Sequence, residues 1–143
     1  MSQRSNGVRP AMWVHCMTIV GERNQDAYCA GSPVFVVADG MGGHCAGDVA
    51  SREVIGAILP LVGRAPVTGA MLRACLTDAR ARIARIAVDS GRPPGSTLSG
   101  VIATRIDGVP SCVVVNIGDS RTYRLDSDAF RQLTIDHTVV QEL

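Results

Sequence analysis

The chain has 143 residues, of which 46% are hydrophobic and 19% charged, so it is long and apolar enough to fold as one domain. Its 14 Lys and Arg against 13 Asp and Glu leave a net charge of +1, which excludes a general basic surface for nucleic acid or anionic lipid. Aromatic residues make up only 3%, which argues against a platform for stacked bases. No apolar run approaches the ~20 residues that span a bilayer, and no signal-peptide pattern follows the N-terminus. We therefore expect a cytoplasmic protein with no membrane segment and no nucleic-acid partner.

The N-terminal part of the chain predicts strands. Residues 1–10 are polar and contain Gly and Pro, as in a flexible lead-in. Met12–Val20 and Ala27–Ala30 are rich in residue types that are typical of strands. Val34–Ala38 is a short continuous apolar run, which indicates a strand buried on both faces. This strand is expected to end at Asp39, where a glycine-rich segment begins.

Two amphipathic helices are expected next. Apolar residues recur at steps of three and four from Ala46 to Leu61, and again within Val67–Asp89. The second helix carries several arginines, which could form a nucleic-acid face. A solvated surface is the better interpretation, because Asp78 and Asp89 interrupt the charge and no aromatic side chains accompany it. The arginines are Arg73, Arg80, Arg82 and Arg85.

The last part of the chain contains three strand-like runs, Thr97–Ile106, Ser111–Ile117 and Arg121–Leu125. Asp107-Gly108 is a strong signal for a hairpin between the first two runs, and Gly118–Ser120 indicates a second tight turn. An antiparallel meander is therefore expected. Because the helices are segregated from these late strands, the expected fold class is α+β.

Asp39 and Gly40 are the most informative residues for a possible metal site. A carboxylate at the end of a strand, followed by glycines that let backbone carbonyls turn inward, offers a side-chain and a main-chain oxygen to a hard divalent cation. The alternative is a strand-ending turn in which Asp39 only accepts backbone N–H bonds, and the pattern favours the two about equally. The glycines at 40, 42, 43 and 47 do not match a dinucleotide-binding loop.

Two further carboxylates are candidates for the same site. Asp26 lies in a polar break between strand-like segments, and its neighbours Asn24 and Gln25 could face the same pocket as Asp39. Asp119 lies in the Gly118–Ser120 turn, where a role in an Asx turn is an equal alternative. The three histidines lack the spacing of a zinc site.

Five sequence segments form a recognisable set when they are considered together. They are Asn24–Tyr28, VVADGMGGHCAGDVAS from Val36, Gly95–Thr97, VVVNIGDSRTYRL from Val113, and QLTIDHTVVQEL from Gln132. In this order they resemble the metal-dependent serine/threonine protein phosphatase family (PPM, type 2C) in its bacterial form, and the DGMGGH-x-A-G-x-x-A-S block is the most specific of them. The resemblance implies a four-layer αββα sandwich, of which this chain represents the N-terminal portion.

The same resemblance implies a reaction and a set of site residues. Phosphoserine or phosphothreonine would be hydrolysed by a water activated between two Mg²⁺ or Mn²⁺ ions ~3.5 to 4 Å apart, with no covalent phosphoenzyme. Asp39 corresponds to the aspartate that bridges the two ions, and Gly40 to the glycine whose carbonyl binds one of them. Asp26 corresponds to the aspartate that holds a metal-bound water, so Asp39 and Asp26 are the expected catalytic residues. Asp119 corresponds to the aspartate associated with a third, weaker ion in bacterial members.

Some positions depart from the family pattern. The arginine that binds the substrate phosphate usually lies five residues before the Asp26 position, where this chain has Gly21, so Arg23 is the candidate for that role. Gln25 stands where many relatives have Glu, and it keeps an oxygen that can face a coordinated water in a supporting role. Met41 occupies the place of a histidine found in eukaryotic relatives, and Met is common there in bacterial members.

Part of the expected metal site is missing up to Leu143. The family has two further metal aspartates in late Asp-Gly and Asp-Asn motifs, whereas two divalent cations would here be balanced only by Asp39 and Asp26. We therefore expect residues 1–10 to be a flexible lead-in and residues 11–143 to be a phosphatase domain that is incomplete at its C-terminus. The chain would then be a truncated, weakly active or inactive form.

The expected partners are phosphorylated proteins, made by a serine/threonine kinase. An alternative is a non-catalytic regulatory module that binds phosphoproteins or a kinase on a partial phosphatase fold. The retention of Asp26, Asp39, Gly40 and Asp119 argues against that alternative, since an inactive module could lose them freely.

Overall fold

The computed structural model describes residues 24–42, 46–87 and 93–137. The predicted lead-in 1–10 and the predicted strand Met12–Val20 lie outside the described residues. The elements in chain order are β1 (Asp26–Gly31), β2 (Val34–Met41), α1 (Ala46–Ile58), the 3₁₀ helix η1 (Leu59–Leu61), α2 (Gly69–Ile83), β3 (Gly95–Ser96), β4 (Leu98–Ile106), β5 (Val109–Ile117), β6 (Tyr123–Leu125) and β7 (Phe130–Gln132).

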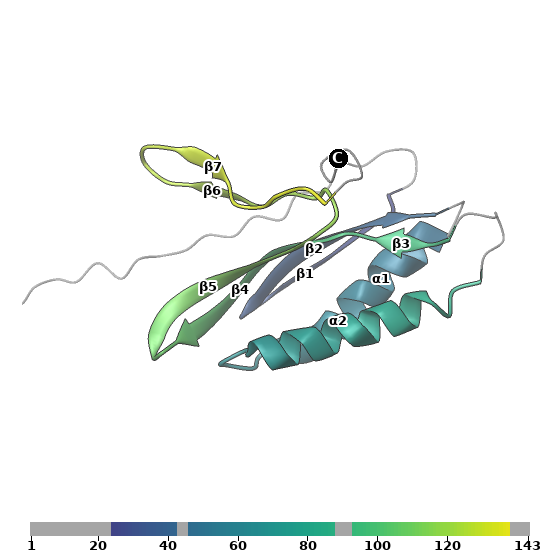
Figure 1. Cartoon of the computed structure of the whole chain (residues 1–143), viewed down its shortest axis with the longest axis horizontal. Helices are drawn as coiled ribbons and strands as arrows, with labels where there is room; N and C mark the ends of the chain where they lie inside the picture. The colour runs from purple at the N-terminus through teal and green to yellow at the C-terminus, as the bar shows by residue number, and fades with distance from the viewer. Residues whose placement is uncertain (1–23, 43–45, 88–92, 138–143) are drawn as a thin grey trace, which may run out of the picture.

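The main sheet is antiparallel, with the strand order β1-β2-β4-β5 and with the short β3 paired to the end of β2. Helices α1 and α2 lie against one side of this sheet, while β6 and β7 form a separate two-stranded sheet beyond the other side (Figure 1). This arrangement confirms the predicted α+β class. Among the helices that the structure describes, none is both long and apolar enough to span a bilayer.

Strand β2 runs further than the sequence predicted. The apolar run Val34–Ala38 was expected to end the strand, but Asp39 pairs with Asp26 of β1, and Gly40 pairs with Ser96 of β3. The strand therefore continues through Met41, because neighbouring backbone on both sides supplies hydrogen-bond partners for these residues. The consequence is that Asp39 belongs to a paired strand rather than to a loop.

The hairpin between β4 and β5 confirms the Asp107-Gly108 prediction. Ile106 pairs directly with Val109, so the connection has two residues. Asp107 has φ +52° and Gly108 has φ +79°, and two successive left-handed residues are the signature of a type I′ turn. Asp and Gly are the residue types that adopt this conformation at low cost, which is why the sequence signal was reliable.

The two helices form one layer over β1, β2 and β4. Helix α1 packs its apolar stripe inward, including Ala50, Val54 and Ile58, and Ile58 has no exposed surface. Helix α2 is shorter than the predicted Val67–Asp89 segment. It begins after Thr68, whose side chain accepts a hydrogen bond from the backbone N–H of Met71, as a helix N-cap does.

The predicted third run, Arg121–Leu125, does contain the strand β6, but its predicted place in the meander is wrong. Tyr123–Leu125 pairs with Phe130–Gln132 rather than with β5, so Gly118–Ser120 does not close a hairpin. The aromatic rings of Tyr123 and Phe130 stack with centroids 4.8 Å apart, and this cross-strand pair favours the β6–β7 pairing. The chain after β5 therefore turns away from the main sheet.

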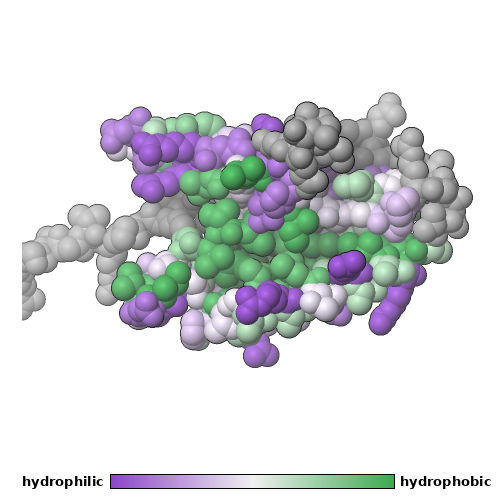
Figure 2. Space-filling model, viewed as in Figure 1, coloured by the Kyte–Doolittle hydropathy of each residue, from purple (hydrophilic) through white to green (hydrophobic). Residues whose placement is uncertain are grey.

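The two faces of the main sheet have different surroundings. Register and side-chain alternation place one set of side chains on the helix-covered face, where each is at most 1% exposed: Val34, Val36, Ala38, Leu98 and Ile102. On the opposite face, Phe35 and Val37 are half-buried, Val114 is 36% exposed and Tyr28 is 63% exposed. The prediction that the Val34–Ala38 strand is buried on both faces is therefore wrong for the part of the chain that the structure describes. Figure 2 shows an apolar area across the middle of the molecule, between the β6–β7 hairpin and the helices.

Candidate metal centre

Asp26 and Asp39 lie directly opposite each other in the antiparallel β1–β2 pair. Asp26 is the first residue of β1, and Asp39 lies near the end of β2. Directly opposed residues project from the same face of a sheet, with Cβ atoms ~4.5 to 5.5 Å apart. The register thus brings together the two carboxylates that the sequence nominated, on the face of the sheet opposite the helices.

The environment of Asp39 disfavours its negative charge. The pKa of the Asp39 carboxyl is raised above its ordinary value, first by partial burial, then by the charge of Asp26 and a hydrogen bond shared with it, and last by the charge of Asp119. Two carboxylates that face each other without a counterion repel, and a divalent cation between them removes that repulsion. A cation between these carboxylates would therefore relieve the repulsion at this strand end.

Gly40 lies against the first turn of helix α1. A Cβ added to Gly40 would come within 1.9 Å of the backbone oxygen of Gly47, and a Cβ added to Gly47 would come within 2.8 Å of the backbone oxygen of Gly40. The two backbones therefore approach so closely that neither position has room for a side chain. Gly40 must be glycine for steric reasons, which accounts for its presence apart from any ligand role.

The segment before β1 is fastened to the same junction. The backbone oxygen of Gln25 accepts hydrogen bonds from the Ser51 hydroxyl at 2.6 Å and from the Gly40 N–H at 3.2 Å. The Gln25 side-chain oxygen lies over Gly47, within 2.4 Å of where a Cβ would be. Ser51 is fully buried on α1, so the helix holds the start of β1 in place. Sequence reasoning did not identify the roles of Gly47 and Ser51, although both belong to the DGMGGH block.

Thr97 connects Asp39 to the Gly118–Ser120 turn. The Thr97 N–H donates to the Asp39 backbone oxygen at 2.8 Å, and the Asp39 N–H donates to the Thr97 hydroxyl at 2.9 Å. The same hydroxyl lies 2.7 Å from the Ser120 hydroxyl. The sequence marks Thr97 only as part of the Gly95–Thr97 motif, because a contact between residues 58 positions apart leaves no local signal in a sequence.

Asp119 is exposed and influences Asp39 through its charge, but it does not complete a ligand cluster. Within residues 24–42, 46–87 and 93–137, no group of three or more His, Cys, Asp or Glu side chains could hold a metal ion. The carboxylates gathered at the site are thus Asp26 and Asp39. The predicted phosphate ligand Arg23 lies outside the described residues.

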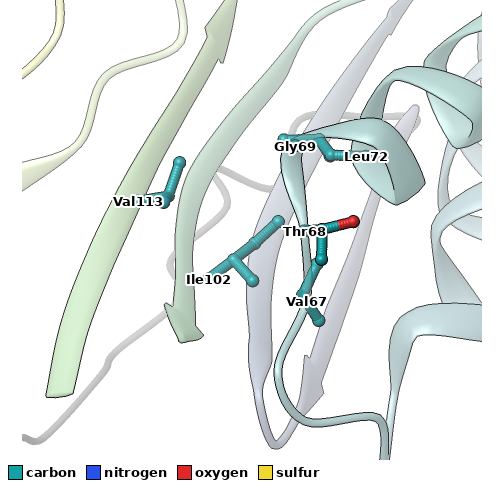
Figure 3. Close-up of a pocket in the computed structure, with 6 residues that line it drawn as sticks. All are labelled: Val67, Thr68, Gly69, Leu72, Ile102 and Val113. Atoms are coloured by element: carbon teal, nitrogen blue, oxygen red, sulfur yellow. The ribbon is translucent and has the colours of Figure 1, made fainter. Parts of the chain in front are cut away.

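A small pocket elsewhere in the structure has no chemistry of this kind. It has a volume of about 30 Å³ and lies between the start of α2 and strands β4 and β5 (Figure 3). Its lining is Val67, Thr68, Gly69, Leu72, Ile102 and Val113. It contains no ionisable side chain, so the candidate site remains the β1–β2 strand end.

The residues at that strand end suit Mg²⁺ or Mn²⁺. Hard divalent cations prefer carboxylate and backbone carbonyl oxygens, and Asp26, Asp39 and Gly40 offer both kinds. The β1–β2 register points the same way, because it sets the Asp26 and Asp39 carboxylates opposite each other.

The comparisons with known proteins address the same region. The family model described as "Protein phosphatase 2C" matches residues 18–140. The chain belongs to the protein phosphatase 2C family. This also confirms the resemblance to PPM phosphatases that the motifs indicated.

Individual relatives of this phosphatase 2C chain agree. It is 36% identical over 132 residues to "Serine/threonine protein phosphatase PstP" of Mycobacterium tuberculosis, covering 87% of this chain and 24% of that protein. It is 36% identical over 123 residues to "Serine/threonine phosphatase stp" of Listeria innocua, covering 78% of this chain and 46% of that protein. The crystal structure of the Mycobacterium tuberculosis phosphatase PstP/Ppp superposes with a TM-score of 0.71 at 34% identity, over 87% of this chain and 53% of that one.

A second solved structure bears on the metal. The catalytic domain of PstP in complex with two manganese ions superposes with a TM-score of 0.72 at 34% identity, over 87% of this chain and 54% of that one. The PPM fold predicted from the sequence is therefore confirmed over the matched part. The chain spans about half the length of these solved relatives and less than half of the two curated ones.

Proposed function

We propose that this chain carries part of the active site of a metal-dependent protein serine/threonine phosphatase, which hydrolyses phosphoserine and phosphothreonine in proteins. The observation that supports it most directly is the β1–β2 register, which sets Asp26 and Asp39 opposite each other beside the Gly40 backbone. The relatives from Mycobacterium tuberculosis and Listeria innocua are both named serine/threonine phosphatases, which supports the proposal. The substrates would be phosphoproteins made by a serine/threonine kinase.

Each nominated residue has a distinct task in this proposal. The Asp39 carboxylate and the Gly40 carbonyl would hold Mn²⁺ or Mg²⁺, and the Asp26 carboxylate would accept hydrogen bonds from water at the site. Two such ions, when bound, supply a water of lowered pKa and neutralise charge on the phosphoryl oxygens. Gln25 would support Asp26 from the preceding residue, Arg23 would bind the substrate phosphate, and Asp119 would take part in a third, weaker site.

The proposal includes a low activity for the 143-residue chain alone. Two divalent cations carry four positive charges, and the carboxylates of Asp26 and Asp39 balance only half of them. Metal affinity falls when ligand charge is insufficient. We therefore expect slow turnover by this chain, with a higher rate in any longer product that supplies further carboxylates.

The test is hydrolysis of a phosphothreonine peptide by the 143-residue chain, measured as released phosphate against Mn²⁺ concentration. Asp39→Asn should lower the Mn²⁺-dependent rate at least about a hundredfold, because it removes the carboxylate that faces Asp26. Asp107→Asn is the matched control, because it makes the same change in the β4–β5 turn, where Asn also adopts the left-handed conformation.

Equal Mn²⁺-dependent rates in Asp39→Asn and in the unmodified chain would contradict the assignment of the site. Binding of the phosphopeptide with no hydrolysis under any metal condition would instead favour the non-catalytic module. Chelation of the metal and its re-addition should remove and restore the rate, which separates metal dependence from damage to the fold.

A further inference from the structure

Thr97 is buried, with 3% of its surface exposed. Its backbone N–H and its side-chain hydroxyl both form hydrogen bonds with the backbone of Asp39. Its N–H donates to the Asp39 backbone oxygen at 2.8 Å, and its hydroxyl accepts the Asp39 N–H at 2.9 Å. Both backbone polar groups of Asp39 are thus held by Thr97. A side chain on a strand end takes its direction from its backbone, so this pair of bonds fixes where the Asp39 carboxylate points.

The Thr97 hydroxyl has a second partner across the chain. It lies 2.7 Å from the Ser120 hydroxyl, and a threonine oxygen can take part in both bonds because it has one donor hydrogen and two acceptor lone pairs. Ser120 follows Asp119 directly in the sequence. One buried oxygen atom therefore lies between the backbone of Asp39 and the turn that carries Asp119.

The methyl group of Thr97 contacts the same turn. Gly118 has φ +93°, and a Cβ added there would come within 2.7 Å of the Thr97 Cγ2 atom. The turn is held from its other side, since the Gly118 oxygen accepts hydrogen bonds from the Asn116 side-chain amide at 3.2 Å and from the His137 N–H at 2.9 Å. The turn therefore has a fixed position against which Thr97 can align Asp39.

We propose that Thr97 is a positioning residue whose hydroxyl sets Asp39 and the Gly118–Ser120 turn at a fixed separation, so that the cation site is organised before a metal ion binds. We call the hydrogen bonds of the Thr97 hydroxyl with Asp39 and Ser120 the link. The expected effect of the link on metal affinity rests on the proposed function, whereas the hydrogen bonds themselves do not. Groups that hold ligands from behind commonly change metal affinity ten- to a hundredfold when removed.

The test uses four variants of the 143-residue chain. Thr97→Val removes the hydroxyl and keeps the shape, Thr97→Ser keeps the hydroxyl and removes the methyl group, and Ser120→Ala removes the second partner. Thr104→Val is the matched control, because Thr104 lies in β4 and its hydroxyl donates to the Val67 backbone oxygen at 2.8 Å, away from Asp39. It should lower stability without affecting the link.

The first readout is amide hydrogen exchange of Asp39, followed by NMR without any metal. Exchange should accelerate about tenfold in Thr97→Val and about threefold in Ser120→Ala, and it should stay within about twofold in Thr97→Ser and Thr104→Val. The proposal is overturned if Ser120→Ala leaves Asp39 exchange unchanged, or if Thr97→Val and Thr97→Ser exchange alike. If Thr97→Val does not fold, the comparison of Thr97→Ser with Ser120→Ala decides.

The second readout is Mn²⁺ affinity, from the electron paramagnetic resonance signal of the free ion. Thr97→Val should weaken binding about tenfold, while Thr97→Ser and Thr104→Val should stay within about twofold of the unmodified chain. Unchanged affinity in a folded Thr97→Val would refute the role of the link in metal binding. Equal binding by the unmodified chain and Asp39→Asn would refute the proposed function instead, and the exchange result would still decide the link.

Discussion

The two faces of the main sheet use similar residue types and differ in what covers them. The helix-covered face presents Val36 and Ile102 at 1% exposed, whereas on the opposite face Tyr28 is 63% and Val114 is 36% exposed. That opposite face also holds Asp26 and Asp39. The difference shows that the buried apolar contacts are concentrated on the face that packs against α1 and α2, while the proposed site lies on the more exposed face.

The largest expected effect comes from adding a methyl group at Gly40, where the backbones of β2 and α1 approach each other closely. In Gly40→Ala the new methyl carbon would lie 1.9 Å from the backbone oxygen of Gly47. Backbone atoms cannot move aside as the end of a flexible side chain can. We expect a loss of more than about 3 kcal/mol in the free energy of unfolding. Chemical denaturation measures it, and a loss below about 1 kcal/mol would contradict the close approach of β2 and α1.

Val115 and Val114 allow the same substitution on opposite faces of one strand. Val115 is 7% exposed beneath the helices, and Val114 is 36% exposed on the other face. Val115→Ala should cost about 1.5 to 3 kcal/mol, and Val114→Ala less than about 1 kcal/mol. Urea denaturation of both variants compares them directly. Equal losses would mean that the opposite face is covered in solution.

The Arg121–Asp136 ion pair, next to the β6–β7 hairpin, should make a pH-dependent contribution to the free energy of unfolding. The Arg121 guanidinium donates to both oxygens of Asp136, at 2.5 and 3.0 Å, and holds the pKa of that carboxyl below its ordinary value of 3.8. A lowered pKa in the fold means that the stabilisation is present above pH 3.8 and is lost as the pH falls through the folded value.

The unmodified chain should therefore be more stable than Asp136→Asn at pH 6, and the two urea midpoints should converge only as the pH falls below 3.8. Asp128→Asn removes the same charge from the turn of the neighbouring β6–β7 hairpin without removing the partner of Arg121, and it controls for net charge. Midpoints that stay equally far apart at every pH would show that the hydrogen bonds, and not the charge of Asp136, carry the effect.

The smallest expected effect is an increase in stability. Gly69 is the first residue of α2, and the nearest atom to an added Cβ is the end of the Arg73 side chain at 3.4 Å. Gly69→Ala should raise the free energy of unfolding by about 0.5 to 1 kcal/mol, because it restricts the unfolded chain without a clash. The midpoint of thermal unfolding measures it. A loss would contradict the helical start at this residue, and the contrast with Gly40→Ala tests whether space alone separates the two glycines.

Local chemistry explains which elements were predictable from sequence. The Asp107-Gly108 turn and the helix predicted from Ala46 to Leu61 follow from residue preferences over short spans. Both predictions are confirmed, except that α1 ends at Ile58 and Leu59–Leu61 form a 3₁₀ helix. The partner of Tyr123–Leu125 was not predictable, because a short apolar run does not indicate which strand it meets. The burial of Val34–Ala38 was overestimated because an apolar run shows that a strand can be covered on both faces, not that it is.

The candidate site also contains residues that the sequence predicted and contacts that it did not. Asp26, Asp39 and Gly40 were found through motif spacing, and the β1–β2 register places the two carboxylates opposite each other. The supporting contacts of Thr97 and Ser51 were missed, because they join residues 58 and 26 positions apart through a single hydroxyl each. Such contacts depend on the assembled tertiary structure, which local patterns do not encode.

The β4–β5 hairpin turn has a consequence for the order in which the molecule assembles. A two-residue loop has a low entropy of closure, and isolated hairpins form in ~1 to 10 μs. The pairing of Val36 with Gly100 instead closes a much longer stretch of chain, which costs more entropy. Asp26 and Asp39 can thus meet early across the short β1–β2 connection, whereas the Thr97 hydroxyl reaches Asp39 only when the long crossover closes. We therefore expect the Thr97–Asp39 contact to form later in folding than the β1–β2 pair that brings the two carboxylates together.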